Sequence, residues 1–213
     1  MTLPWTVENA VPSHIREKIE KIGSKSPALY FIAFLDIISE LKKCERTGWI
    51  SKIEKPESVA DHMYRMSIIC MFCNPSLNSA RCSQIALCHD MAEAIVGDIT
   101  PCDPNVDKDE KHRRELAAIE YMRDLVAKFN PAAGRMVYEL WCEYEYQTTD
   151  EAKFVKQVDK FELLLQTTEY MEMHPDSTDS IKEMLGSKKY LDGEVLQWSD
   201  ALDAYRNLRN SNK

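Results

Sequence analysis

The sequence is poor in the residues that build repeats and flexible linkers. Its 213 residues include only 6 glycines and 9 prolines, and no segment recurs at a fixed period. Long apolar runs are also missing, because the longest, residues 28–35, ends at Asp36. Residues 1–9 do not contain a basic region followed by an apolar stretch. We therefore expect a globular protein without a signal peptide or a membrane-spanning helix.

Positive charge is scarce as well. The chain has 27 Lys and Arg against 35 Asp and Glu, which gives a formal net charge of −8. A surface that binds nucleic acid needs clustered Lys and Arg. The one basic cluster, residues 111–114, lies between Glu110 and Glu115, which is typical of a solvated helix face. We expect no stable nucleic-acid binding, although a pocket with its own local charge can still bind a small anion.

The cysteines do not predict a disulfide framework. There are 7, an odd number, and the pair Cys70 and Cys73 has no second CxxC motif with which to form a zinc ribbon. Several lie within apolar helical patterns, where a free cysteine behaves as a small hydrophobic residue. This usage is typical of a reducing compartment, and we expect a location in the cytosol or the nucleus.

Helical periodicity dominates what the sequence does contain. Capping residues, stop signals and three- and four-residue apolar spacing predict helices over residues 27–44, 59–73, 79–95, 109–129, 131–146 and 150–173, with one or two shorter helices after residue 177. The first is apolar on most sides, which predicts a buried central helix. Alternating polar and apolar residues are nearly absent. We predict an all-α fold, a single compact helical bundle over residues 26–213, with residues 1–25 as an N-terminal extension.

The dipeptide His89-Asp90 is the first candidate for chemistry. His89 follows Ile85 by four residues, which places it near the apolar face of its helix. Burying the ionised carboxylate of Asp90 beside it is costly unless the charge is compensated. A divalent cation would compensate it and take both side chains as ligands.

His62 and Asp159 are ligand-type residues on two other predicted helices. His62 lies between Val59 and Met66 on an apolar face, where a core histidine bonded to a backbone carbonyl is the alternative. Asp159 follows Val155 by four residues and borders a buried stripe. Metal sites in helical bundles are built from inward-facing residues of separate helices. Two imidazoles and two carboxylates suit a divalent cation that keeps open positions.

Glu93 adds a further carboxylate to the same region. It follows His89 by four residues and Asp90 by three, so one helix would present all three on one side. A purely structural metal would not need this extra carboxylate. The alternative is an ordinary solvated charge on a helix.

The order His62, then His89-Asp90, then a distant Asp159 is a recognisable pattern. With it, the chain resembles the HD-domain phosphohydrolases, and most closely the HD-domain 5'-deoxynucleotidases, including the eukaryotic branch of HD-domain-containing protein 2. The matching blocks are residues 46–49, 56–66, 89–93, 97–101, 110–115 and 155–160. The resemblance extends from about residue 28 to about residue 170 and implies an all-α HD domain.

The resemblance implies roles for the matching residues around a metal. The catalytic ion would be bound by His62, His89, Asp90 and Asp159. Manganese, cobalt and magnesium are the expected ions. Glu93 would be the acid–base residue, and Asp98 would also be essential. In the eukaryotic branch a second divalent ion would be held by Glu93, Asp98 and the Ile99 carbonyl.

The implied activity is hydrolysis of 2'-deoxyribonucleoside 5'-monophosphates to deoxynucleoside and phosphate. Arg46 and Trp49 would contact the nucleotide. In the bacterial relatives this Arg and this Trp are adjacent, whereas Thr47-Gly48 separates them here. A packing role is the alternative for Trp49. Relatives are often homodimers. Two other functions remain open: a phosphohydrolase acting on nucleoside triphosphates or cyclic nucleotides, and a non-catalytic helical scaffold stapled by its metal.

Overall fold

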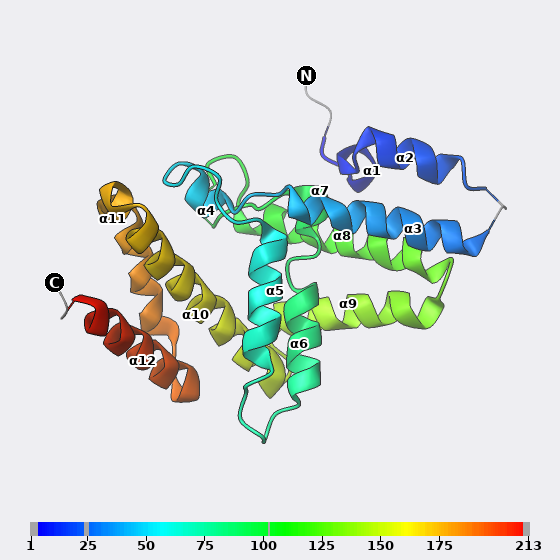
Figure 1. Ribbon diagram of the computed structural model, residues 1–213. Coiled ribbons are helices and arrows are strands. Elements are labelled where there is room, and N and C mark those ends of the chain that lie inside the picture. The colour runs from blue at the N-terminus through cyan, green and yellow to red at the C-terminus, as the bar shows by residue number, and fades with distance from the viewer. Residues whose placement is uncertain (1–3, 24–25, 102, 211–213) are drawn as a thin grey trace.

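The computed structural model describes residues 4–23, 26–101 and 103–210, and within these ranges every regular element is a helix. Figure 1 shows their arrangement. In chain order the α-helices and 3₁₀-helices (η) are α1 (Val7–Ala10), α2 (Ser13–Glu20), α3 (Pro27–Ile38), η1 (Ser39–Lys42), α4 (Thr47–Ile50), α5 (Val59–Cys70), α6 (Ser79–Cys88), α7 (Glu93–Val96), α8 (Lys108–Ala127), α9 (Pro131–Glu145), α10 (Asp150–Met173), η2 (Pro175–Ser177), α11 (Thr178–Ile181), η3 (Lys182–Tyr190) and α12 (Gly193–Asn210). The predicted all-α fold class is confirmed.

Side-chain caps fix where the two longest site-bearing helices begin. At the start of α5, the Asp61 backbone N–H donates to Ser58 Oγ over 3.2 Å, and the Ser58 N–H donates to Asp61 Oδ2 over 2.9 Å. This reciprocal pair is a capping box. At the start of α10, the Ala152 N–H donates to Thr149 Oγ1 over 3.1 Å. These starts set which face of each helix looks inward.

The helices meet around the pair α5 and α6, which lie side by side in the middle of the molecule (Figure 1). On one side, α8 and α9 form a helical hairpin, and α3 packs along α8. On the other side, α10 contacts α5, α6 and α9, while η3 and α12 cover its outer face. The middle of the bundle is therefore where side chains from α5, α6 and α10 come together.

The α8–α9 hairpin is packed unusually closely at Gly134. A Cβ atom added there would lie 2.6 Å from the Arg123 carbonyl oxygen and 3.1 Å from the Ala127 backbone nitrogen. The neighbouring atoms belong to backbone, which cannot move aside as a flexible side chain can. Glycine at this position therefore permits the approach of α9 to α8.

The helix over residues 27–44 is not the buried central helix that the sequence predicts. α3 ends at Ile38, continues as η1, and buries Ala33, Phe34 and Ile37. Its other face is exposed, and Ile32 on that face is 53% exposed. α3 contacts α2 and α8 on one side, and in the described part of the chain no helix covers the other. The prediction was wrong because a wholly apolar helix can also lie at an edge.

Residues ahead of α3 pack onto the helical core. Val11, Ile15 and Ile22 are buried in the same cluster as side chains of α3, α8 and α9. α1 contacts α7 and α8, and α2 contacts α3. The predicted boundary between an extension and a domain at residue 26 stays a prediction.

Two other sequence features can be placed in the structure. No helix in the described ranges is both long and apolar enough to cross a membrane. Six cysteines in these ranges are free thiols, and Cys102 lies outside the described residues.

Candidate metal centre

The His-Asp dipeptide lies in a turn between two helices. α6 ends at Cys88 and α7 begins at Glu93. Between them the backbone forms tighter three-residue bonds, from the Met91 N–H to the Cys88 carbonyl (3.2 Å) and from the Glu93 N–H to the Asp90 carbonyl (3.0 Å). The prediction of one continuous helix over residues 79–95 was wrong, because helical periodicity does not reveal such a local tightening.

The four predicted ligands come together in the middle of the bundle. Ligand atoms of His62, His89 and Asp90 all lie within 4.8 Å of one another. Asp90 Oδ2 lies 3.0 Å from His89 Nε2 and 3.9 Å from His62 Nε2. Asp159 Oδ1 lies 3.5 Å from His62 Nε2. Side chains from α5, the α6–α7 turn and α10 therefore surround one point.

Both imidazoles are oriented through their Nδ1 atoms. His62 Nδ1 lies 2.5 Å from Glu162 Oε2, and His89 Nδ1 lies 2.9 Å from the Ala86 carbonyl oxygen. Since both partners are acceptors, each Nδ1 carries the hydrogen and each Nε2 is left to face the centre. Both Nε2 atoms are buried and have no hydrogen-bond partner among the described residues. Two such nitrogens beside two carboxylates fit a divalent cation.

The charges around this point favour a cation. Burial raises the pKa of Asp159, but Lys160 and His62 outweigh it and hold that pKa well below its usual range. The pKa of Asp90 is likewise low, because His89 and Arg46 outweigh burial. Burial lowers the pKa of His62, yet Glu162 and Asp159 bring it to about 9. Two ionised carboxylates therefore face the centre, and a divalent cation would neutralise them.

Glu93 differs from the two aspartates. It is 4% exposed, and its Oε2 atom is buried without a hydrogen-bond partner in the described ranges. Burial raises its pKa well above the usual range, and the neighbouring charges of Asp90 and Asp98 add to that rise. Burial and these neighbouring charges therefore favour the protonated form of its carboxyl group, which is the form that a general acid requires.

Asp98 and Ile99, which the family resemblance pairs with Glu93 in a second metal site, already have hydrogen-bond partners. The Thr47 N–H donates to Asp98 Oδ2, and Thr47 Oγ1 donates to the Asp98 carbonyl, each over 2.7 Å. Lys111 Nζ donates to the Ile99 carbonyl over 2.7 Å. The second set of residues therefore does not fit a divalent ion in the way that the first set does.

The two predicted substrate contacts have different surroundings. Arg46 reaches the centre, and its Nη1 atom lies 3.4 Å from Asp90 Oδ2. Trp49 is 1% exposed and packs edge-on against Tyr170, with ring centroids 5.2 Å apart. The structure thus gives Trp49 the packing position, and contact of either residue with a nucleotide stays a prediction.

Sequence reasoning missed the residues that support His62. Glu162 is buried and bonds His62, while Arg65 Nε donates to Glu162 Oε1 over 2.7 Å. The signal was present in part, because Glu162 follows Asp159 by three residues on α10 and Arg65 follows His62 by three on α5. Glu57 also lies beside His62 and Glu162. Glu162 therefore orients His62 through its Nδ1 atom, on the opposite side of the ring from the predicted metal, and Arg65 holds Glu162 in place.

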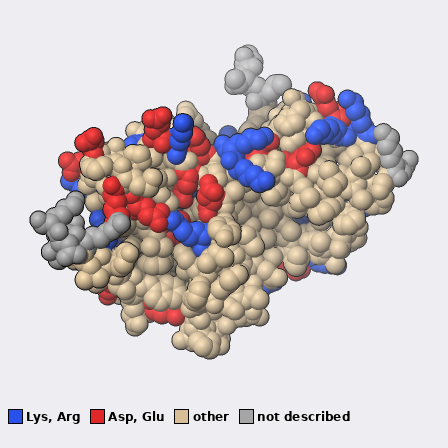
Figure 2. Space-filling model, in the orientation of Figure 1, with Lys and Arg blue, Asp and Glu red and all other residues tan. Residues whose placement is uncertain are grey.

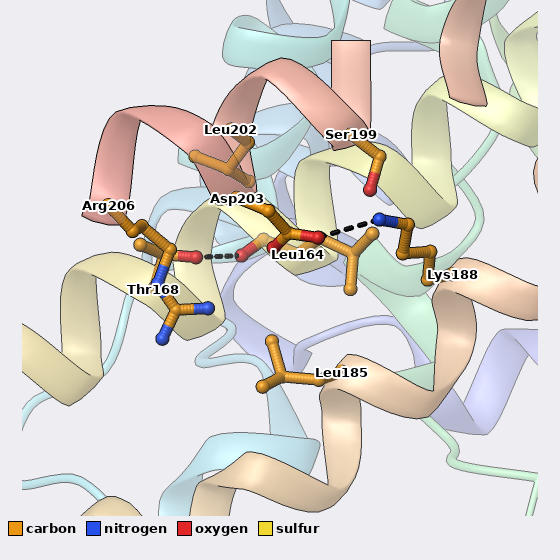
Figure 3. A pocket seen from close by; sticks show the side chains of 8 residues that line it. All are labelled: Leu164, Thr168, Leu185, Lys188, Ser199, Leu202, Asp203 and Arg206. Atoms are coloured by element: carbon orange, nitrogen blue, oxygen red, sulfur yellow. Dashed lines mark hydrogen bonds and ion pairs between the residues drawn. The ribbon is translucent and has the colours of Figure 1, made fainter. Parts of the chain in front are cut away.

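A small cavity lies apart from this centre, between α10, η3 and α12 (Figure 3). Its volume is about 180 Å³, and its lining residues are Leu164, Thr168, Leu185, Lys188, Ser199, Leu202, Asp203 and Arg206. Lys188 turns toward Asp203 and pairs with it over 2.6 Å, and with Asp200 over 2.8 Å. Lys188 is therefore already paired, and the other cation of the lining, Arg206, donates to Met171 Sδ over 3.6 Å.

The chain is similar to known proteins along most of its length. Residues 38–197 match the family model described as HD domain. The chain is 42% identical over 190 residues to mouse "5'-deoxynucleotidase HDDC2", covering 87% of this chain and 93% of that protein. It is 39% identical over 210 residues to "5'-deoxynucleotidase YBR242W" of Saccharomyces cerevisiae, covering 97% and 86%. The solved structure of HD domain-containing protein YGK1, also from Saccharomyces cerevisiae, superposes with a TM-score of 0.72 at 30% identity, covering 96% of this chain and 98% of that one.

Proposed function

The chain belongs to the HD-domain family, and we propose that it is a metal-dependent 5'-deoxynucleotidase that hydrolyses 2'-deoxyribonucleoside 5'-monophosphates to deoxynucleoside and phosphate. The observation that supports this most is the pair of buried Nε2 atoms, on His62 and His89, that face the Asp90 and Asp159 carboxylates without a partner in the described residues. Relatives named 5'-deoxynucleotidase that align along most of the chain support the choice of reaction.

The catalytic ion would be held by His62 and His89 through Nε2 and by the carboxylates of Asp90 and Asp159. Mixed imidazole and carboxylate donors suit manganese, cobalt or magnesium. When bound, the ion supplies positive charge that stabilises the phosphoryl group in the transition state. Glu162 would keep His62 directed at that ion through the Nδ1 hydrogen bond.

Side chains of the protein would carry the rest of the reaction. Arg46 is 16% exposed at the edge of the centre, where its planar guanidinium would pair with substrate phosphate oxygens. Glu93, whose burial raises its pKa and favours its protonated form, would donate a proton to the leaving 5'-oxygen. Asp98, whose Oδ2 accepts from the Thr47 N–H, would be the other carboxylate that moves a proton. Trp49 would hold the α4 segment behind Arg46, and stacking on the nucleotide would require that segment to open.

A homodimer is the assembly that the surface supports. Large apolar side chains are exposed on α3, on α5 and directly after α5, among them Leu29, Ile32, Leu35, Tyr64, Ile68, Met71 and Phe72. In the view of Figure 2, the lower right of the molecule, in the region of α3, α5 and α6 in Figure 1, is largely free of Lys, Arg, Asp and Glu, which gather in the upper and left parts of the view. An uncharged apolar face suits a second copy of the same face. Light scattering should give twice the monomer mass, and Ile32→Asp should give the monomer; a monomeric wild type would contradict the dimer.

Phosphate release from a panel of nucleotides tests the reaction. The protein is stripped with chelator, reloaded with manganese, cobalt or magnesium, and given each deoxynucleoside 5'-monophosphate beside its ribonucleotide. Metal-dependent release from the deoxy series is the expected result. Hydrolysis of triphosphates or cyclic nucleotides alone would show that the substrate belongs to one of those classes instead. No release from folded, metal-loaded protein would favour a scaffold.

A further inference from the structure

Lys111 connects α8 to the loop that follows α7. It lies in the first turn of α8, its side chain is 26% exposed, and its ammonium donates to the Ile99 carbonyl over 2.7 Å. Ile99 itself is buried. A lysine that reaches a buried loop carbonyl, rather than solvent, has a specific partner.

The surroundings of Lys111 are acidic. Burial lowers its pKa, but the charges of Glu115, Glu93, Asp90 and Asp98 outweigh burial and raise it. The ammonium therefore keeps its charge and neutralises this side of the centre. It lies 3.5 Å from Glu115 Oε1, one turn further along α8, so a second acceptor is available to it.

The same place is where Glu93, Asp98 and the Ile99 carbonyl would hold a second ion. Thr47 already donates to Asp98 Oδ2, and Lys111 already donates to the Ile99 carbonyl. An ammonium and a divalent cation that both approach one carbonyl oxygen closely repel each other, because both carry positive charge.

We propose that Lys111 is the protein's own cation on this side of the site, and that Lys111 and a second divalent ion exclude each other at the Ile99 carbonyl. This proposal rests on the proposed function, since it concerns the same centre. For a second ion to reach the Ile99 carbonyl, the Lys111 ammonium would have to leave it, and Glu115 is the acceptor within its reach. We therefore expect the ion at His62 and His89 to bind more tightly than any second ion.

Manganese titration of the chelator-stripped full chain tests this exclusion. Bound and free manganese are measured by electron paramagnetic resonance and by calorimetry for the wild type and for Lys111→Met. We expect the variant to bind the second ion at least about tenfold more tightly, with the first ion unchanged. Lys111→Gln, which is also uncharged, should do the same. Lys111→Arg should bind like the wild type, because it keeps the charge.

Lys108→Met is the matched control, since it removes an exposed lysine from the same helix three residues earlier. It should leave both binding steps unchanged. A second ion that binds Lys111→Met and Lys111→Gln no more tightly than the wild type would overturn the proposal, as would a wild type that binds two ions with equal affinity. Hydrolysis of deoxynucleoside monophosphates is measured on the same samples. If the wild type does not hydrolyse them, the proposed function is contradicted. The change in second-ion affinity would still decide the role of Lys111.

Discussion

Glu162 is absent from the predicted ligands, yet its carboxylate sets the direction of His62. It is buried, lies 2.5 Å from His62 Nδ1, and accepts from Arg65 Nε over 2.7 Å. The change Glu162→Gln keeps the shape of the side chain and removes its charge. We expect it to weaken metal binding without removing any atom that touches the ion.

The expected magnitude follows from the role of such partners in metal sites. Losing the acceptor that orients a ligating histidine costs about 10- to 100-fold in metal affinity, or roughly 1.4 to 2.7 kcal/mol. The larger loss applies if the new amide turns its NH₂ group toward His62, and the smaller if its oxygen still accepts from Nδ1. Arg65 keeps Gln166 and Glu169 as partners, which limits the loss of folding stability.

Manganese affinity and turnover are measured separately to test this. For Glu162→Gln, the manganese concentration for half-maximal phosphate release should rise about 10- to 100-fold, while kcat at saturating manganese should change little. Glu169→Gln is the matched control, because it removes an exposed partner of Arg65 and does not touch His62. An unchanged manganese requirement in Glu162→Gln, or an equal rise in the control, would refute the positioning role.

Three further variants test other parts of the structure. Gly134→Ala should lower the free energy of unfolding by about 1–3 kcal/mol in a denaturant titration, because its Cβ would meet the Arg123 carbonyl; Gly186→Ala, whose Cβ meets nothing described within 4 Å, should change it far less. Glu93→Ala should abolish phosphate release and keep the first metal bound, and near-normal release would remove its acid–base role. Asp159→Asn should lower the metal content of purified protein, and an unchanged content would remove it from the ligands.

The candidate ligands could be predicted from the sequence because they combine two signals. His62 and Asp159 are polar residues on apolar helix faces, and burial without a partner is costly for such groups. Each therefore implies a partner, and helix phase alone places it inward. Their convergence in space was implied by the resemblance and depends on how α5 and α10 pack.

Other features were out of reach because they depend on contacts between distant residues. His62 and Glu162 lie 100 positions apart, and Lys111 and Ile99 lie 12 apart across a loop. Helical periodicity relates residues that are three or four positions apart, so it does not reveal contacts between residues this far apart in the sequence. The turn at residues 89–92 was missed because three-residue bonding replaces helical bonding there without a Gly or Pro to mark it. The exposed face of α3 was missed because composition does not say what covers a helix.

One measurement tests the metal centre and the reaction together. Chelator-stripped protein is titrated with manganese, and bound metal and phosphate release from a deoxynucleoside 5'-monophosphate are followed in the same samples. Release should rise in proportion to the first bound equivalent, and a His62→Ala, His89→Ala double variant should lose both. Release that is complete before metal binds, or that persists in the double variant, would contradict the assignment of His62, His89, Asp90 and Asp159 as the catalytic metal centre.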